Sequence, residues 1–279
     1  MAYLPEVEVL RKDLEKEVVG KRVAEVTVKT AKLVKRHRHR PDFIAALEGR
    51  KIEGVGRRGT WLILDLDDAT SLCVRTAPQA VLSRETANAE PTSQTQVVIR
   101  FTTGGALHLG DPEKASQLFV AASDTLDDLT ELAPGGIDPL SGTFTWQSFA
   151  RYLQSRPTEL KALLLDETFM LGLGDLYADE ILWSAGLAPD RLPAALSSQE
   201  VRRLYRALFE VLYEAVKQGG TTEPEADGDH ADLFGEPGAY GEQLRAHGRN
   251  GQPCPRCRRP IVHSTFDGYD AYHCSSCQG

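Results

Sequence analysis

The C-terminal tail contains two Cys-x-x-Cys pairs, and this feature restricts the possible folds of the chain more than any other. Cys254 and Cys257 form the first pair, and Cys274 and Cys277 form the second after 16 intervening residues. Two such pairs supply four thiolates, the ligand set of a tetrahedral structural zinc site with no open position for chemistry. The intervening residues suit a β-hairpin. The sequence therefore predicts a small zinc finger that depends on one Zn²⁺ to fold.

The remaining cysteine and the N-terminus bear on the compartment. No apolar run reaches the length of a membrane span, and the chain starts without the charged and apolar segments of a secretion signal. In the cytosol, cysteines are more often ligands than disulfides. We therefore expect a cytoplasmic protein that does not bind membranes, with Cys73 as a buried thiol.

The chain is acidic, with a formal net charge of −8. This balance counts against a nucleic-acid partner, because neutralising phosphates requires a basic surface. Two basic segments could override it locally, and each is interpreted either as a solvated face or as a nucleic-acid contact. The first holds Lys32, Lys35, Arg36, Arg38 and Arg40, and the second holds Arg245, Arg249, Arg256, Arg258 and Arg259.

The first 125 residues predict one helix followed by many short strands. Residues 5–19 have a proline suited to a first helical turn, one apolar face and a terminating glycine. The β-type runs that follow are punctuated by Gly, Asp and Asn, which is typical of a β-sandwich or barrel. A hairpin turn is predicted at 103–105. The predicted strands are 22–28, 51–55, 61–66, 72–74, 97–101, 107–109 and 117–120.

The character of the chain changes at residues 126–142, an acidic linker rich in Gly and Pro. Helices are predicted after it at 145–154, 159–166, 175–185 and 198–217, the last with a capping sequence at its start and two glycines at its end. The predicted fold class is α+β. It comprises an N-terminal β-sandwich domain with flanking helices (1–125), a helical domain (143–235) and the zinc finger (236–279).

A second motif joins two of these helices and reads Gly172-Leu173-Gly174-Asp175, continuing to Glu180. A glycine-containing turn that ends at a helix N-terminus offers free N–H groups and the positive end of the helix dipole to a phosphate. Ordinary helix–turn–helix corners share this pattern. The motif alone therefore leaves both interpretations open.

Taken together, these motifs resemble the formamidopyrimidine-DNA glycosylase and endonuclease VIII family over essentially the whole chain. Residues 4–8 (Leu-Pro-Glu-Val-Glu) match its N-terminal signature, and 172–180 match its helix–two-turn–helix motif. Residues 232–235 and the cysteine hairpin match its C-terminal module. The resemblance implies DNA held between a β-sandwich and a helical domain. It also implies that a damaged base is flipped out, its glycosidic bond is cut, and the backbone is nicked by β,δ-elimination.

The positions that carry this chemistry are substituted. The resemblance places the nucleophile, an N-terminal proline amine, at Ala2, the glutamate general acid at Tyr3, and a DNA-holding lysine at Thr60. A free α-amine titrates at about 7.7–8.0, so the Ala2 amine remains a candidate Schiff-base nucleophile once Met1 is removed. A phenol titrates at about 10 and cannot take the acid–base role of the carboxylic acid near neutral pH.

The DNA-reading positions implied by the resemblance differ as well. The stretch whose methionine fills the gap left by the flipped base corresponds to 75–78, and the loop that completes the wedge corresponds to 111–116. Neither retains an intercalating side chain. The phosphate-binding asparagine beside Gly174 corresponds to Asp175. The remaining DNA-contacting positions are His247, Arg249 and Tyr269.

Three functions remain open from the sequence. The first is a monomer that binds damaged double-stranded DNA, abasic or oxidised, weakly and with family catalysis lost or much reduced, at the bacterial nucleoid. The second is an active DNA glycosylase and AP lyase that uses the Ala2 amine. The third is a repurposed fold that binds a protein or small ligand instead of DNA. The helix-turn glycines and the basic tail favour the first over the third, whereas Asp175 and the net charge favour the third.

Overall fold

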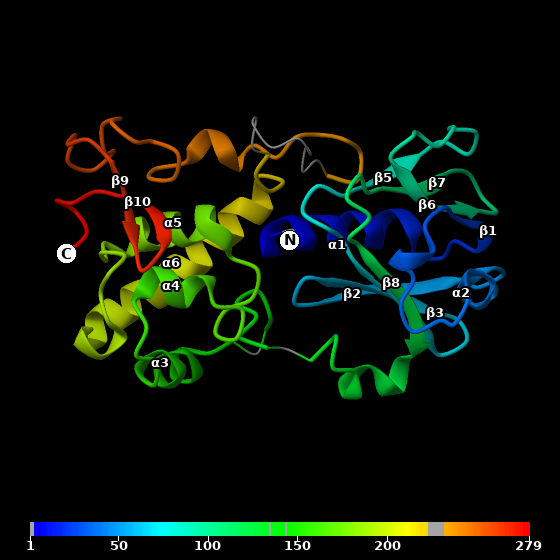
Figure 1. The fold of residues 1–279 in the computed structure, drawn as a ribbon, viewed down its shortest axis with the longest axis horizontal. Helices are drawn as coiled ribbons and strands as arrows, with labels where there is room; N and C mark the ends of the chain where they lie inside the picture. Colours follow the sequence, from blue (N-terminus) through cyan, green and yellow to red (C-terminus); the bar gives the residue numbers. More distant parts are fainter. Residues whose placement is uncertain (1–2, 134, 143, 223–231) are drawn as a thin grey trace. The chain divides into compact units, whose positions relative to one another are not determined.

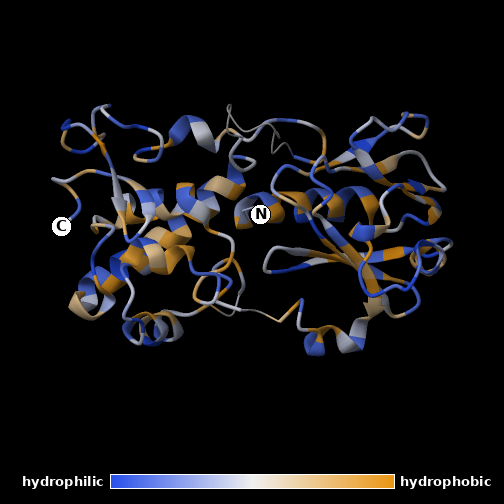
Figure 2. Ribbon diagram, viewed as in Figure 1, coloured by the Kyte–Doolittle hydropathy of each residue, from blue (hydrophilic) through white to orange (hydrophobic). Residues whose placement is uncertain are grey.

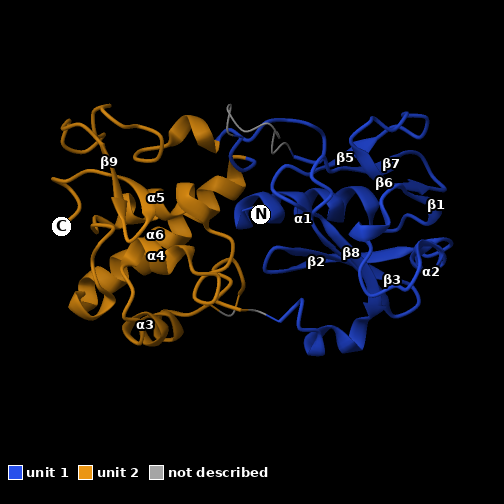
Figure 3. Cartoon of the chain, in the orientation of Figure 1, with its two compact units in different colours: residues 1–133, 219–239 blue, residues 134–218, 240–279 orange. Residues whose placement is uncertain are grey.

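The computed structural model of the chain describes residues 3–133, 135–142, 144–222 and 232–279. The chain divides into two compact units (Figures 1 and 3), unit 1 with residues 1–133 and 219–239, and unit 2 with residues 134–218 and 240–279. The chain thus returns to unit 1 at 219–239, a segment that the sequence prediction divided between the helical domain and the zinc finger. No helix in the described ranges is long and apolar enough to span a bilayer.

Unit 1 is a β-sandwich of two antiparallel four-stranded sheets, which confirms the predicted N-terminal fold. One sheet has the strand order β1–β6–β7–β5 and the other has β2–β3–β4–β8. The helices of unit 1 are α1 (Leu4–Val18), α2 (Arg40–Leu47) and the 3-10 helices η1 (Ala31–Leu33) and η2 (Ser123–Asp128). Its strands are β1 (Val23–Val28), β2 (Ile52–Arg58), β3 (Trp61–Leu66), β4 (Thr70–Arg75), β5 (Val81–Glu85), β6 (Thr95–Phe101), β7 (Ala106–Gly110) and β8 (Gln117–Ala122).

The residues of β3 are apolar on both faces, which explains why its sheet is covered on both sides. Leu62 and Leu64 belong to the main core, which α1 and the opposite sheet complete. Trp61 and Ile63 alternate with them and join a second cluster that includes Leu126 of η2. Cys73 of β4 is fully buried in this second cluster, as predicted. Figure 2 shows hydrophobic residues along the strands and hydrophilic residues in many connecting loops.

One α-helix and one strand of unit 1 were not predicted, nor were its two 3-10 helices. α2 begins inside the basic segment, where the His39 N–H donates to Asp42 Oδ2 at 3.0 Å and the helix buries Phe43 and Leu47. β5 consists entirely of half-buried residues and pairs with β7. Its pairing is a tertiary feature that no local alternation of apolar and polar residues reveals.

Unit 2 contains the predicted helices. Its longest helix starts at the predicted capping sequence, where Glu200 Oε2 accepts the Ser197 N–H at 2.7 Å. Gly186 ends the helix Gly174–Ala185 in a left-handed conformation, with φ of 67°. The helices are α3 (Trp146–Gln154), α4 (Leu160–Leu165), α5 (Gly174–Ala185) and α6 (Ser198–Lys217), with the 3-10 helices η3 (Pro193–Ala195) and η4 (Tyr240–Gln243).

The predicted β-hairpin between the cysteine pairs is present as β9 (Val262–Phe266) and β10 (Tyr269–His273) (Figure 1). His263 and Tyr272 lie opposite each other in the hairpin, and their rings stack with centroids 4.6 Å apart. β10 packs on α5, so the hairpin belongs to the body of unit 2.

Candidate functional site

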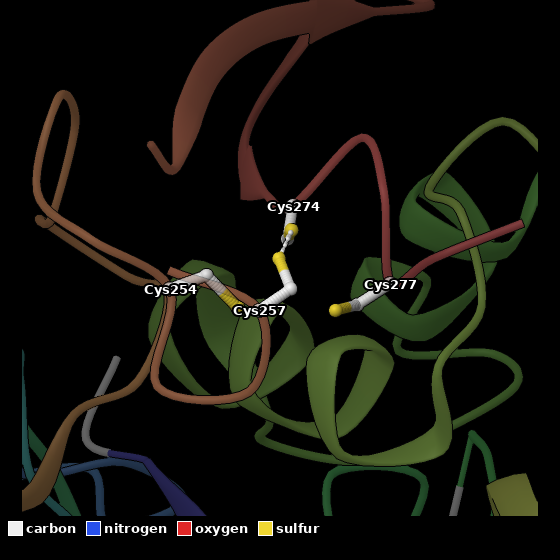
Figure 4. Close-up of side chains that lie close together, drawn as sticks. All are labelled: Cys254, Cys257, Cys274 and Cys277. Atoms are coloured by element: carbon white, nitrogen blue, oxygen red, sulfur yellow. Dashed lines mark hydrogen bonds between the residues drawn. The ribbon is translucent and has the colours of Figure 1, made fainter. Parts of the chain in front are cut away.

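The four tail cysteines converge at the base of the hairpin (Figure 4). Their Sγ atoms all lie within 4.8 Å of one another. A tetrahedral metal with metal–sulfur bonds of about 2.3 Å places its sulfur ligands about 3.8 Å apart, so this arrangement fits a single ion. Cys254 and Cys274 are fully buried, whereas Cys257 and Cys277 are partly buried.

Two residues, Gln278 and Arg256, fix the cysteine cluster to the end of α5. Gln278 accepts the Cys274 N–H at 2.7 Å and donates to the Leu187 carbonyl at 2.9 Å. The guanidinium of Arg256 lies 4.0 Å from the centroid of the Trp183 ring and donates to the Trp183 carbonyl at 2.7 Å. The cysteine cluster is therefore anchored to the helix that carries the second motif.

The second motif forms a tight turn between α4 and α5. Gly172 and Gly174 have φ of 60° and 63°, a conformation that only glycine adopts readily, and this explains why two glycines stand here. α5 begins at Gly174, so its first N–H groups follow directly after the turn. Tyr177 is fully buried and stacks on Tyr240, with ring centroids 5.9 Å apart. The geometry is that of a helix N-terminus prepared for a phosphate.

Asp175 lies in the first turn of α5 and is ion-paired. Its Oδ1 is 3.1 Å from the ammonium of Lys161, which comes from α4 and is fully buried. The same ammonium lies 2.7 Å from Oδ1 of Asp179, and Oδ2 of Asp179 lies 2.8 Å from Nδ1 of His247. The side chain of Asp175 is 56% exposed, so its carboxylate also faces water at the helix N-terminus.

Glu180, which follows Asp179 in α5, forms hydrogen bonds to the backbone of the segment before the first cysteine pair. Its carboxylate accepts the N–H groups of Arg245 and Ala246 at 3.0 and 2.8 Å, and that of His247 at 3.0 Å. Burial raises the pKa of Glu180, and these three hydrogen bonds oppose that rise. Glu180 thereby fixes the backbone at His247.

The basic residues of the tail differ in whether their side chains form contacts within the protein. The Arg249 guanidinium donates to the carbonyls of Leu244 and Pro253 and to Gln252 Oε1, at 3.1, 3.4 and 3.1 Å, so it braces its own loop. Arg258 is exposed, and its side chain makes no hydrogen bond or ion pair within the described ranges. Tyr269 is 42% exposed at the start of β10.

The other candidate positions belong to the N-terminal part of the sequence. Ala2 lies outside the described residues. Tyr3 is half-buried and occupies the N-cap of α1, where its carbonyl accepts the Val7 N–H at 3.2 Å. Glu6 is buried, and its Oε1 accepts the Thr221 N–H at 2.8 Å, which fixes a carboxylate one helical turn from the chain start.

Thr60 lies in the turn between β2 and β3 and is only 8% exposed. Arg57 ties this turn to α1, because its Nε lies 2.9 Å from Glu8 Oε2 and its Nη1 donates to the Gly59 carbonyl at 2.7 Å. A buried threonine offers no cation to a phosphate. The turn is thus held in place without the charge that the resemblance implies for it.

The two segments that correspond to the wedge contact each other. The Ala77 N–H donates to Ser116 Oγ at 3.0 Å, and Asp111 Oδ2 accepts the Ser116 N–H at 2.8 Å. Ala77 is buried, so the exposed tips consist of Pro78 and residues 112–115. No large apolar side chain stands at these tips.

Lys161, Asp179 and Glu180 were not assigned a role from the sequence. Asp179 and Glu180 lie within the quoted motif, and two adjacent acids on an otherwise apolar helix signal buried ion pairs or hydrogen bonds. Lys161 gave no such signal, because a lysine in a short helix is usually exposed.

The sandwich, the helix–two-turn–helix motif and the cysteine hairpin together define the architecture of a base-excision DNA glycosylase. Family models agree with this class. The formamidopyrimidine-DNA glycosylase N-terminal domain matches residues 1–118. The formamidopyrimidine-DNA glycosylase H2TH domain matches residues 136–226.

Known proteins match along the full length of the chain. The formamidopyrimidine-DNA glycosylase of Pelotomaculum thermopropionicum is 34% identical over 278 residues, covering 100% of this chain and 99% of that protein. The Thermus thermophilus relative is 36% identical over 279 residues, with the same coverage. The chain belongs to the formamidopyrimidine-DNA glycosylase family.

Solved structures confirm the fold class. The crystal structure of MutM (Fpg) from Thermus thermophilus superposes with a TM-score of 0.84 at 34% identity, covering 99% of this chain and 98% of that one. A complex of Lactococcus lactis Fpg with DNA that contains an abasic site gives a TM-score of 0.88 at 26% identity, covering 99% of each chain.

Proposed function

We propose that the chain is a DNA-repair protein that binds double-stranded DNA carrying abasic or oxidised lesions, as a monomer, with base excision lost or much reduced. The proposal rests on the intact helix–two-turn–helix turn of unit 2 together with wedge positions in unit 1 that carry no intercalating side chains. The Lactococcus lactis relative has been solved with DNA containing an abasic site and with DNA containing an oxidised pyrimidine. Such a partner would place the protein at the nucleoid of a bacterial cytoplasm.

The turn and the exposed tips predict how DNA is bound. The N-terminus of α5 and exposed cations such as Arg258 can contact phosphates, whereas Pro78 and Ala115 cannot fill the gap left by a flipped base. Flipping a paired base costs a few kcal/mol, which these tips do little to offset. Binding should therefore be weak, strongly dependent on salt, and relatively favourable for abasic sites, where no base has to leave the stack.

Gel-shift titrations of an abasic-analogue duplex and an undamaged duplex at several salt concentrations test this proposal, with strand cleavage scored in parallel. We expect micromolar affinity that falls steeply with salt and favours the abasic duplex. Nanomolar, lesion-specific binding at physiological salt would contradict the assignment of residues 75–78 and 111–116 as a lost wedge. Absence of binding at low salt would favour the repurposed fold.

A second candidate, AP lyase activity through the Ala2 amine, is favoured by one observation. Glu6 remains at the start of α1 as a buried carboxylate held by the Thr221 N–H. In this reaction the neutral amine attacks the C1′ aldehyde of an opened abasic site and water leaves as the imine forms. Borohydride reduces that imine to a stable amine. An adduct mapped to Ala2 would support the lyase, whereas an adduct on Lys114 would indicate incidental chemistry.

We further propose that the metal held by the four cysteines is Zn²⁺, with a structural role. The support is the all-sulfur ligand set and its closed geometry, which leaves no position for a substrate. The cluster stabilises the hairpin and the loop before it. Metal analysis of protein purified without chelator should find one zinc per chain.

A further inference from the structure

A chain of charged groups leads from the N-terminal end of α5 to the tail segment. The ammonium of Lys161 is shared by the carboxylates of Asp175 and Asp179, at 3.1 and 2.7 Å. One cation between two anions leaves a net charge of −1. Water screens the charges of Lys161 and Asp179 little, because both side chains are buried. Among the described residues, His247 forms the one further ion pair with this set, through Asp179, whose charge also acts on Glu180 and His273.

The position of His247 makes its protonation consequential. Nδ1 lies 2.8 Å from Asp179 Oδ2, so this nitrogen donates in both the neutral and the protonated ring. Nε2 makes no hydrogen bond within the part of the chain that the structure describes, and the side chain is 21% exposed. A proton can therefore be taken up from water at Nε2 without breaking an existing contact.

The surroundings of His247 are defined on each side. α5 contributes Asp179 to its ring and Glu180 to its N–H group, and α4 contributes Lys161 behind Asp179. β10 contributes Tyr272, whose ring meets that of His247 edge-on, with ring centroids 5.0 Å apart. His273, also in β10, interacts electrostatically with Asp179.

We propose that His247 is a proton-dependent positioning residue, whose imidazolium form neutralises the Lys161–Asp175–Asp179 set and strengthens phosphate binding at the N-terminus of α5. This inference rests on the proposed DNA-binding function. The added proton changes the net charge of the set from −1 to zero and creates an N–H donor at Nε2. Both effects favour an anion, and neither requires a movement of the backbone that Glu180 fixes.

Affinity for a duplex with an abasic analogue, measured from about pH 8 to about pH 6, tests the inference over the range where imidazoles titrate. We expect the wild-type affinity to rise about threefold to tenfold as the pH falls, the size of a single charge near a screened protein surface. His247→Gln keeps a donor to Asp179 but stays neutral. It should bind with an affinity that changes little with pH.

His263→Gln is the matched control, because His263 also pairs with an aspartate, Asp270 at 3.4 Å, and forms no ion pair with the Lys161–Asp175–Asp179 set among the described residues. It should retain the wild-type pH dependence. Calorimetry in two buffers of different ionisation enthalpy adds a second readout, in which wild type takes up protons on binding DNA and His247→Gln takes up fewer. Equal pH dependence and equal proton uptake in wild type and His247→Gln would overturn the inference. Absence of DNA binding by any of the proteins at any pH would instead contradict the proposed function itself.

Discussion

The two units differ in what their family-like residues do. In unit 2 the residues that match the family shape the structure: Gly172 and Gly174 form the turn, Tyr177 fills the core, and the cysteines close the hairpin. In unit 1 the sandwich is equally intact. The positions that the resemblance links to chemistry hold Tyr3 and Thr60, and the loops linked to base flipping carry no large apolar side chain at their exposed tips. A chain that drifts without selection would lose both kinds of residue. This difference supports the proposal that the fold binds damaged DNA while base excision is lost or much reduced.

Removal of the metal should have the largest effect on unit 2. Zinc binding contributes about 10–16 kcal/mol to the folding of isolated finger peptides, so Cys254→Ser should abolish stoichiometric zinc and unfold the hairpin. Metal analysis and limited proteolysis measure this. Cys73→Ser is the matched control, because Cys73 is a buried core residue of unit 1. Burial raises the pKa of its thiol to about 12, so the thiol is unreactive. It should lower the stability of the sandwich and retain one zinc. Full zinc content in Cys254→Ser would contradict the four-sulfur site.

The buried ion pair should come next in size. Lys161→Met leaves the carboxylate of Asp179 buried without its cation, which typically costs about 3–5 kcal/mol. Urea unfolding measures the loss. Lys217→Met, which breaks an exposed pair with Glu214 at 3.6 Å, should cost less than about 1 kcal/mol. Equal losses in the two variants would contradict the structural role assigned to Lys161.

The sequence predicted elements whose signals are local and missed those whose signals are distant. Periodicity and capping residues placed α1, α6 and most strands, and the cysteine spacing placed the hairpin. β5 was missed because its residues are all half-buried, so no alternation is visible, and because it is a strand only through its pairing with β7. Likewise, Lys161 is buried only because Asp179 reaches it from another helix, and the contact between Ala77 and Ser116 joins loops 39 residues apart. Family resemblance supplied the site positions, yet only coordinates show that Arg249 braces its own loop.

Asp175→Asn should have a moderate effect in the opposite direction. It removes an exposed anion at the N-terminus of α5 and leaves Lys161 paired with Asp179, so a phosphate meets less repulsion. DNA affinity at low salt should rise about threefold to tenfold. Glu210→Gln changes the charge equally on an exposed face of α6 and should leave affinity nearly unchanged. Unchanged affinity in Asp175→Asn would show that DNA does not dock at this turn.

The smallest expected effect concerns the stability of unit 1 below neutral pH. His37 Nε2 accepts the Val120 N–H at 3.0 Å, and burial lowers the pKa of His37. The unfolded chain therefore takes up a proton first as the pH falls, so the stabilisation is complete above the usual histidine pKa of about 6.5 and is lost below it. Thermal melts of wild type and His37→Gln across this range should converge at low pH, with exposed His39→Gln as the control. Parallel curves for wild type and His37→Gln would contradict this role.

Single-turnover excision of an oxidised base, with the protein in excess over a labelled duplex and the bound fraction measured in the same tubes, tests the contrast between the units most directly. Loss of a general acid alone typically slows such a step about a hundred- to ten-thousand-fold. We predict that bound DNA is cleaved at least about a hundredfold more slowly than by the Thermus thermophilus relative under identical conditions. Excision at a comparable rate would show that Tyr3 and Thr60 support the chemistry and would contradict the account.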